Sequence, residues 1–181
     1  IISGLVGSEM CIRDSDNGNI LFQGKEISKL RVGEIARLGL LRTFQQTRIY
    51  NKMNCVDNME ISVSHRGRRF GSMFSSRKGE ILDRAEELLD FVGLYSKRFL
   101  ISGDLSFGQQ KLLEFAMALM NDPKVLLLDE PTAGINPTLI NGLIDRLKRA
   151  NEEMGVTLFV IEHNMRVCLL YTSDAADEGS S

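Results

Sequence analysis

Apolar residues recur along this chain at two spacings, and the change of spacing separates predicted helices from predicted strands. Helical spacing runs over residues 81–92, 112–120 and 139–147. Two unbroken apolar runs, Val125–Leu128 and Leu158–Ile161, instead favour buried strands of a parallel sheet, the first buried on both faces and the second beginning at Thr157. The pattern therefore predicts helices and strands in alternation through the second half of the chain.

Residues that stop and start helices lie where this pattern changes. Asn121-Asp122-Pro123 should end the helix before the first run, and Asn136-Pro137 looks like an N-cap followed by proline at the first helical position. Gly155 should end the helix that follows. Strand, helix and strand in this order form a βαβ unit with a right-handed crossover, which indicates an α/β fold.

The first half of the chain has weaker signals. Short strands are expected over Asn19–Gln23 and Leu41–Phe44, with a short helix over Leu30–Leu38. Residues 51–102 are mainly helical in pattern, and the basic, Gly/Ser-rich stretch His65–Lys78 within them is expected to be a surface loop. These elements extend the α/β core and add a helical insert to it.

The expected domain organisation is one folded unit between two terminal segments that are not part of it. Residues 16–50 and 103–167 should form a partial α/β core, and residues 51–102 a helical subdomain. Residues 1–15 and 168–181 resemble translated sequencing-adaptor sequence and are expected to be non-native. A native loop and a native tail are the alternatives.

Composition narrows the class of protein. The 181 residues are 43% hydrophobic and 25% charged with a net charge of −2, so the chain can bury one core and has no large basic field for nucleic acid. Its three cysteines are scattered, which fits neither a disulfide framework nor a metal site. The aliphatic runs are too short to span a membrane.

Polar residues follow each predicted strand of the βαβ unit directly. Asp129-Glu130 comes after the first strand and Glu162-His163 after the second. Since ligands of open α/β sheets bind beyond the carboxyl ends of the strands, these groups should meet at one edge. One carboxylate can hold Mg²⁺ there while another orients water, although a carboxylate pair can also be a helix cap and a lone histidine is often structural.

Five short motifs occur in order along the chain: RTFQQ (Arg42–Gln46), LSFGQQ (Leu105–Gln110), VLLLDEP (Val125–Pro131), TAGINP (Thr132–Pro137) and VIEHN (Val160–Asn164). They resemble, in the same order, the Q-loop, signature, Walker B strand, D-loop and switch-histidine segment of the ATP-binding subunits of ABC transporters. The resemblance implies a P-loop NTPase-type parallel sheet with a helical subdomain insert, and its wording is similar to subunits for branched-chain amino-acid uptake.

The resemblance also implies roles for named residues, with ATP and Mg²⁺ as cofactors. Glu130 and His163 would be catalytic, and Asp129 and Gln45 would face the metal. The residues expected at ATP are Gln45, Ser106, Phe107, Gly108, Gln109 and Asn136. Ser106 and Gly108, expected just before a helix, would contact the terminal phosphate held by the opposite subunit. Phe107 stands where the signature usually has Gly, and Asn136 where the D-loop usually has Asp.

Partners follow from the same resemblance: a second ATP-binding subunit, transmembrane permease subunits that the helical region would dock against, and indirectly a periplasmic or extracellular binding protein. The expected place is the cytoplasmic face of the plasma (inner) membrane, bound peripherally. No GxxxxGK[ST] phosphate-binding loop occurs in the sequence, so the core is expected to be an incomplete copy that is itself inactive.

Three other readings remain open. The chain could belong to another ABC transporter with a different uptake or export substrate. A non-transport ABC ATPase, such as one of DNA repair, is a second reading, but the insert between Gln45 and Ser106 shows no sustained heptads. A degenerate structural module is the third, which the missing loop favours and the remaining motifs oppose.

Overall fold

A computed structural model describes residues 18–43, 49–63 and 74–163, with only the backbone for residues 74–78. The expected non-native segments, Gln45 and most of the predicted 65–78 loop lie outside these residues. Contacts between residues divide the chain into two compact units, residues 1–35 and 36–181. In the described residues, no helix combines the length and the hydropathy that a membrane crossing requires.

The first unit contains a short hairpin. Strand β1 (Leu21–Phe22) pairs in antiparallel register with β2 (Lys25–Glu26). Gln23 and Gly24 join them with φ of +51° and +75°, the left-handed pair that a two-residue hairpin turn requires. The predicted strand over residues 19–23 is therefore confirmed in part, whereas β2 was missed because two residues are too few to show an alternating pattern.

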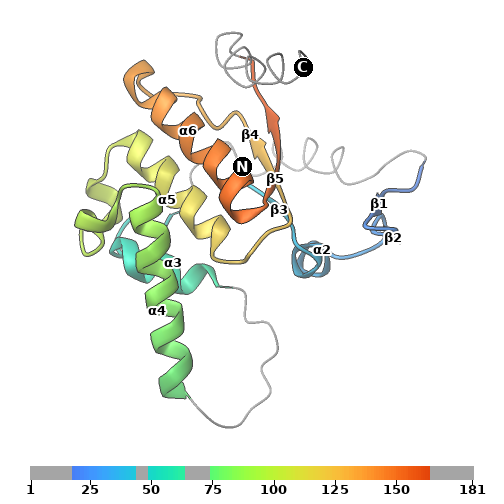
Figure 1. The fold of residues 1–181 in the computed structure, drawn as a ribbon, viewed down its shortest axis with the longest axis horizontal. Helices are drawn as coiled ribbons and strands as arrows, with labels where there is room; N and C mark the ends of the chain where they lie inside the picture. Colours follow the sequence, from blue (N-terminus) through green and yellow to red (C-terminus); the bar gives the residue numbers. More distant parts are fainter. Residues whose placement is uncertain (1–17, 44–48, 64–73, 164–181) are drawn as a thin grey trace, which may run out of the picture. The chain divides into compact units, whose positions relative to one another are not determined.

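The second unit is built on a parallel sheet in the order β3-β4-β5 (Figure 1). Helix α2 (Val32–Leu38) leads into β3 (Leu40–Arg42), which pairs in parallel with β4 (Val125–Asp129). Strand β5 (Thr157–Ile161) pairs in parallel with the other side of β4. The predicted α/β fold with a parallel sheet is confirmed.

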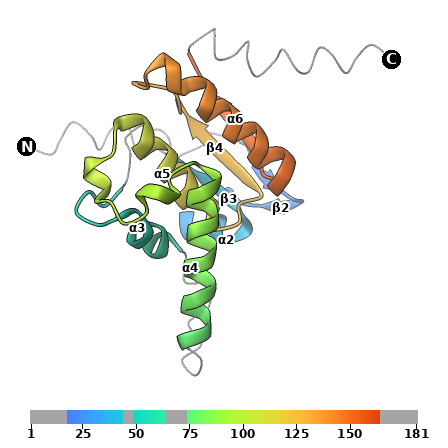
Figure 2. The ribbon, with the colours of Figure 1, turned by 60° about the vertical axis from the view of Figure 1, so that its left-hand side comes forward.

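The predicted βαβ unit is present, and its capping residues set its bounds. Helix α6 (Pro137–Met154) connects β4 to β5, and Figure 2 shows it running alongside β4. The side chain of Asn136 accepts a hydrogen bond from the Thr138 N–H, and proline occupies the first turn. Gly155 ends the helix at φ +67°, a conformation that favours glycine. These three predictions are confirmed.

Burial of the strands differs from the prediction. In β4 only Leu126 and Leu128 are buried, and in β5 Phe159 is 59% exposed and Ile161 45% exposed. The expectation that β4 is buried on both faces and that β5 is a buried strand was wrong. The reason is that the apolar cluster formed with the helices includes Leu126 and Leu128 of β4 and packs against Leu158 and Val160 of β5, so the alternate side chains of β5 remain on the surface.

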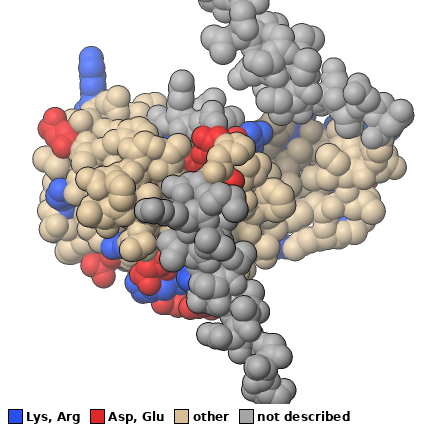
Figure 3. Space-filling model, turned by 90° about the horizontal axis from the view of Figure 1, so that it is seen from above, with Lys and Arg blue, Asp and Glu red and all other residues tan. Residues whose placement is uncertain are grey.

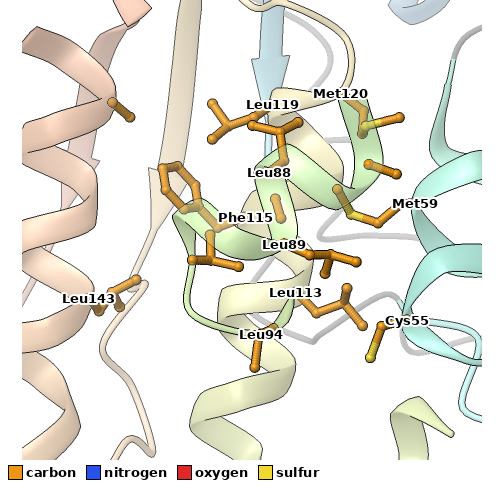
Figure 4. Close-up of a cluster of buried hydrophobic side chains, with 14 of the residues drawn as sticks. Cys55, Met59, Leu88, Leu89, Leu94, Leu113, Phe115, Leu119, Met120 and Leu143 are labelled. Atoms are coloured by element: carbon orange, nitrogen blue, oxygen red, sulfur yellow. The ribbon is translucent and has the colours of Figure 1, made fainter. Parts of the chain in front are cut away.

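A helical layer precedes β4 and packs against it. It comprises α3 (Cys55–Ser62), α4 (Phe74–Phe91), the 3₁₀ turns η1 (Tyr95–Lys97) and η2 (Ser102–Asp104), and α5 (Phe107–Leu119). Figure 4 shows side chains of α3, α4 and α5 meeting in one apolar cluster, which Leu143 of α6 joins. The helical spacing predicted for α4 and α5 is confirmed by buried residues that include Leu88, Leu89, Leu113 and Leu119.

Helix α4 begins earlier than expected. Residues 74–78, predicted to be the end of a surface loop, are helical, so that part of the prediction was wrong. The amphipathic segment that follows is stabilised by packing, and Ser, Arg and Lys have helix propensities that allow one more turn before it at a small cost in free energy. Gly79 inside the helix costs only about 1 kcal/mol relative to alanine.

A buried amide fixes the junction between α3 and the segment before α5. The Asn58 side chain is fully buried and accepts a 2.7 Å hydrogen bond from the Tyr50 N–H. Its Nδ2 lies within 3.4 Å of the carbonyl oxygens of Tyr50, Met53 and Asn54 and of the Ser102 hydroxyl, and its two N–H groups are shared among these acceptors. The Ser102 hydroxyl in turn donates to the Tyr50 carbonyl. Two loops far apart in sequence are thus held together four residues before Ser106.

Candidate active site

The carboxyl ends of β4 and β5 bring the two predicted polar pairs side by side. Asp129 lies opposite Ile161 in the parallel register, and the Glu130 N–H donates to the Ile161 carbonyl at 2.8 Å. The pairing therefore continues one residue beyond the strands and stops where Glu162 and His163 begin. The prediction that these groups meet at one edge of the sheet is confirmed (Figure 1).

The side chains of Glu130 and His163 are in contact at this edge. The Nε2 atom of His163 lies 3.2 Å from Oε1 of Glu130. The carboxylate is largely sheltered, with 25% of its side chain exposed, whereas the imidazole is 81% exposed. A sheltered base beside an accessible imidazole can take up a proton and contact an incoming anionic group at the same place.

The backbone at Glu130 is in an uncommon conformation. Its φ is +48°, in the left-handed region that costs a residue with a side chain about 1–2 kcal/mol. Two hydrogen bonds close the turn after it: the Ala133 N–H donates to the Glu130 carbonyl, and the Ile135 N–H donates to the Thr132 carbonyl. Such strain persists only where surrounding contacts hold it, and it is concentrated at functional sites.

Thr132 and Glu162 make one of these contacts. The hydroxyl and the backbone N–H of Thr132 both donate to Oε1 of Glu162, at 2.6 and 3.0 Å. Thr132 is buried, so the carboxylate of Glu162 is used to tie the turn after β4 to the end of β5. The sequence analysis grouped Glu162 with the chemistry-bearing residues, but its contacts give it this structural role.

Asp129 has a partner that the sequence analysis did not identify. The Arg42 guanidinium, at the end of β3, donates to Oδ2 of Asp129 at 2.8 Å. With 42% of the arginine side chain and 22% of the aspartate side chain exposed, solvent screens this pair strongly. The sequence alone does not give this pair, because it depends on β3 lying next to β4 in the sheet.

The acidic residues at this edge suit magnesium. Among the described residues, no group of three or more His, Cys, Asp or Glu side chains is placed to hold a metal ion. Mg²⁺, however, is commonly held by one or two carboxylates together with the phosphates of a substrate and water. The adjacent carboxylates of Asp129 and Glu130 are oxygen donors of that kind, so the residues present fit the ion.

A small cavity lies beside Asp129. It has a volume of about 20 Å³ and is lined on its polar side by Thr43, Lys111, Glu114 and Asp129. That volume holds about one water molecule and no larger ligand. Lys111 and Glu114 are nearly buried and lie 3.6 Å apart, so α5 carries an ion pair close to the strand ends.

The second group of predicted residues lies at the N-terminus of α5. Ser106 is the N-cap, and its hydroxyl and N–H exchange hydrogen bonds with Gln109 in a capping box. Helix α5 begins at Phe107, so Gly108 lies inside the first turn and not before the helix as expected. The capping box accounts for the earlier start, because it satisfies the N–H groups of Ser106 and Gln109 at the beginning of the helix.

On the face drawn in Figure 3, most of the described surface is uncharged, and acidic and basic side chains occur in a few small groups. The sequence has 22 Lys and Arg against 24 Asp and Glu, so this mixture is what its net charge of −2 implies.

Asn136, the remaining predicted ligand, uses its side-chain oxygen to accept hydrogen bonds from the N–H and hydroxyl of Thr138.

Solved structures similar to this one are ATP-binding cassettes of ABC transporters. A structure titled as the ADP conformation of MJ1267, an ATP-binding cassette, matches with a TM-score of 0.73 and 27% identity, over 91% of this chain and 69% of that chain. The dimeric post-hydrolysis structure of the cassette MJ0796, bound to ADP and Pi, matches with a TM-score of 0.70 and 26% identity, over 89% and 71%.

Curated relatives agree with the structures. A probable branched-chain amino acid transport ATP-binding protein, LivG of Archaeoglobus fulgidus, is 37% identical over 162 residues, covering 87% of this chain and 63% of the relative. LivG of Escherichia coli, a high-affinity branched-chain amino acid transport ATP-binding protein, is 30% identical over 160 residues, covering 84% and 62%. The chain thus spans slightly less than two thirds of these relatives. The ABC transporter family matches residues 3–133, and the chain belongs to that family.

Proposed function

We propose that this chain is the ATP-binding subunit, or part of the subunit, of an ABC importer for branched-chain or related amino acids. The observation that carries the proposal is the contact of Glu130 with His163 at the ends of two adjacent parallel strands. The substrate class rests on the relatives, whose names give branched-chain amino acid transport. A subunit for another transported substrate is the alternative that family membership leaves open.

Glu130 is proposed as the base that orients and deprotonates the attacking water, and His163 as the group that contacts the terminal phosphate. The sheltered position of the carboxylate supports the first role, and the exposed imidazole 3.2 Å away supports the second. Asp129 would hold Mg²⁺, which would neutralise phosphate charge. The Arg42 guanidinium donates to the Asp129 carboxylate at the strand end, and Mg²⁺ would share that carboxylate with it.

Ser106, Phe107, Gly108 and Gln109 are proposed to face a nucleotide that an opposite subunit holds. The support is the first turn of α5, where the helix dipole and the backbone N–H groups outside the Ser106–Gln109 capping box favour an anion. Gln45 and Asn136 keep their proposed places at the nucleotide. The hydrogen bonds of Asn136 to Thr138 bear on this, since the side chain must keep or exchange them to reach a second subunit.

The proposed partners are a second ATP-binding subunit, transmembrane permease subunits and, indirectly, a substrate-binding protein. The dimeric cassette structure supports the first, and the transport names of the relatives support the others. Work at a membrane with such partners would place the chain peripherally on its cytoplasmic face.

The test of Glu130 uses a chimera, in which residues 16–163 replace the matching segment of the A. fulgidus relative. Glu130→Gln should abolish steady-state hydrolysis while ATP binding persists, because the amide cannot accept the proton from water. Glu153→Gln, at an exposed glutamate of α6, is the matched control and should leave turnover unchanged. Full turnover in Glu130→Gln would remove that residue from the role of base.

The 181-residue chain itself should hydrolyse ATP far more slowly than about one turnover per second, the lower range for enzymes. The reason is that its sequence contains no GxxxxGK[ST] segment to surround the phosphates with backbone N–H groups. Turnover of the purified chain near that rate, unaffected by Glu130→Gln, would contradict both the proposed site and its proposed inactivity.

A further inference from the structure

Phe107, which stands where the family's signature has glycine, lies against Gly134 in the turn after β4. A β-carbon placed on Gly134 would lie 3.0 Å from Cε1 of the ring and 3.6 Å from Cδ1. Carbon atoms normally approach to about 3.5–4.0 Å, so the edge of the ring fills the space that a side chain would need. Gly134 also has φ +73°, which independently favours glycine.

The neighbouring residue makes a second close approach to the same segment. A β-carbon on Gly108 would lie 2.9 Å from Cδ1 of Leu139 and 3.5 Å from Cγ2 of Ile135. Two successive residues of α5 therefore fit against residues 134–139. The first turn of α5 and the turn between β4 and α6 form one close-packed contact.

The turn that Gly134 closes is the one that carries Glu130. Its two internal hydrogen bonds join Ala133 to Glu130 and Ile135 to Thr132, and the Thr132–Glu162 contact holds it from the side of β5. The Phe107 ring holds the opposite end of the turn. Because Glu130 has an unfavourable φ, contacts at both ends are needed to keep it there.

We propose that Phe107 is a positioning residue for Glu130, acting through Gly134. This inference rests on the proposed role of Glu130 in hydrolysis. It also predicts an effect of bound nucleotide: a phosphate at the first turn of α5 would lie next to Phe107, whose ring contacts the turn that carries Glu130. Phe107 thereby couples the first turn of α5, which would face a nucleotide held by a partner subunit, to Glu130 at the ends of this chain's own strands.

The experiment is hydrogen exchange of backbone amides in the 181-residue chain, without nucleotide. Phe107→Gly should speed exchange at Ala133 and Ile135 by about fivefold, since the ring contributes several contacts of about 0.1–0.2 kcal/mol each. Exchange at Leu119, in the core of α5, should not change, and Phe107→Tyr should restore protection. Phe99→Ala is the matched control, because that aromatic is 66% exposed and lies outside the turn.

Unchanged exchange at Ala133 and Ile135 in Phe107→Gly would overturn the proposal, as would an equal rise at Leu119, which would show general loosening. If Phe107→Gly does not fold, Phe107→Leu takes its place, with a smaller expected rise. A second measurement compares Gly134→Ala alone and combined with Phe107→Gly. The urea midpoint should fall more for Gly134→Ala when Phe107 is present, and equal falls would contradict the contact.

These measurements need no ATP, so they are independent of the proposed function. Faster exchange in Phe107→Gly together with full turnover of the Glu130→Gln chimera would leave the contact standing and remove the catalytic role of Glu130. In the same chimera, Phe107→Gly should lower kcat by a larger factor than it raises KM, because it displaces the base, whereas the backbone N–H groups at the first turn of α5 remain to face the nucleotide. A change in KM alone would overturn the positioning role.

Discussion

Replacing Asn58 by alanine should destabilise the chain far more than its small size suggests. The side chain is fully buried: its Oδ1 accepts from the Tyr50 N–H, and its two Nδ2 hydrogens are shared among four acceptors on Tyr50, Met53, Asn54 and Ser102. Removing it leaves the Tyr50 N–H buried without its 2.7 Å acceptor. Two of the carbonyl oxygens keep another donor: the Ser102 hydroxyl still donates to the Tyr50 carbonyl, and the backbone N–H of residue 58 still donates to the Asn54 carbonyl.

The magnitude follows from this inventory. One orphaned N–H costs about 1–3 kcal/mol, and the loss of the bonds whose acceptors keep other donors adds about 1 kcal/mol. We expect Asn58→Ala to lower the free energy of unfolding by about 2–4 kcal/mol. Asn58→Asp should cost more, since it retains the acceptor for Tyr50 but turns a carboxylate oxygen toward the Asn54 carbonyl and buries a charge.

The assay is urea unfolding followed by circular dichroism, with equal slopes required before the variants are compared. The control is Asn151→Ala, an exposed asparagine with one Nδ2 bond to the Val156 carbonyl, which should cost about 0.5–1.5 kcal/mol. A cost for Asn58→Ala no larger than that of the control would refute the reasoning. So would an Asn58→Asp variant as stable as the unaltered chain.

Three further predictions concern single side chains. Burial raises the pKa of the Cys55 thiol above its usual 9.0. The stability gained by burying the neutral thiol is therefore present below about pH 9 and is lost as the pH rises further. Mass spectrometry should find Cys55 unlabelled by maleimide at pH 7.5 until urea unfolds the chain. Ser106→Ala should cost about 1 kcal/mol in urea unfolding, because it removes the cap of α5, and no loss would contradict the capping box. Thr132→Val should cost about 1.5–3 kcal/mol by removing the 2.6 Å bond to a carboxylate, and an unchanged midpoint would show that the Thr132 N–H alone suffices.

Sequence reasoning succeeded where the signal was local. The caps of α6 at Asn136 and Gly155 and the helical stripe of α4 depend on neighbours in the chain, and all were correct. The meeting of Asp129-Glu130 with Glu162-His163 was also predictable, because a βαβ unit makes its two strands parallel and adjacent.

Contacts between distant segments were not predictable in the same way. Nothing in a single sequence places the Phe107 ring on Gly134, because that contact depends on how α5 and α6 pack. The pairing of Arg42 with Asp129 required the order of the strands, and the exposure of Phe159 required knowing which helices cover which face. The roles proposed for individual residues at the nucleotide still depend on the family resemblance and on the experiments above.

Strand β5 has a practical consequence for work with this polypeptide. In the described part of the chain it lies at the edge of its sheet, with one side unpaired and with Phe159 and Ile161 exposed on one face. An edge strand with apolar side chains offers hydrogen-bond groups and an adhesive face to another copy. Self-association should therefore rise steeply with protein concentration, and dilute samples kept away from pI 5.8 will be the ones that stay monodisperse.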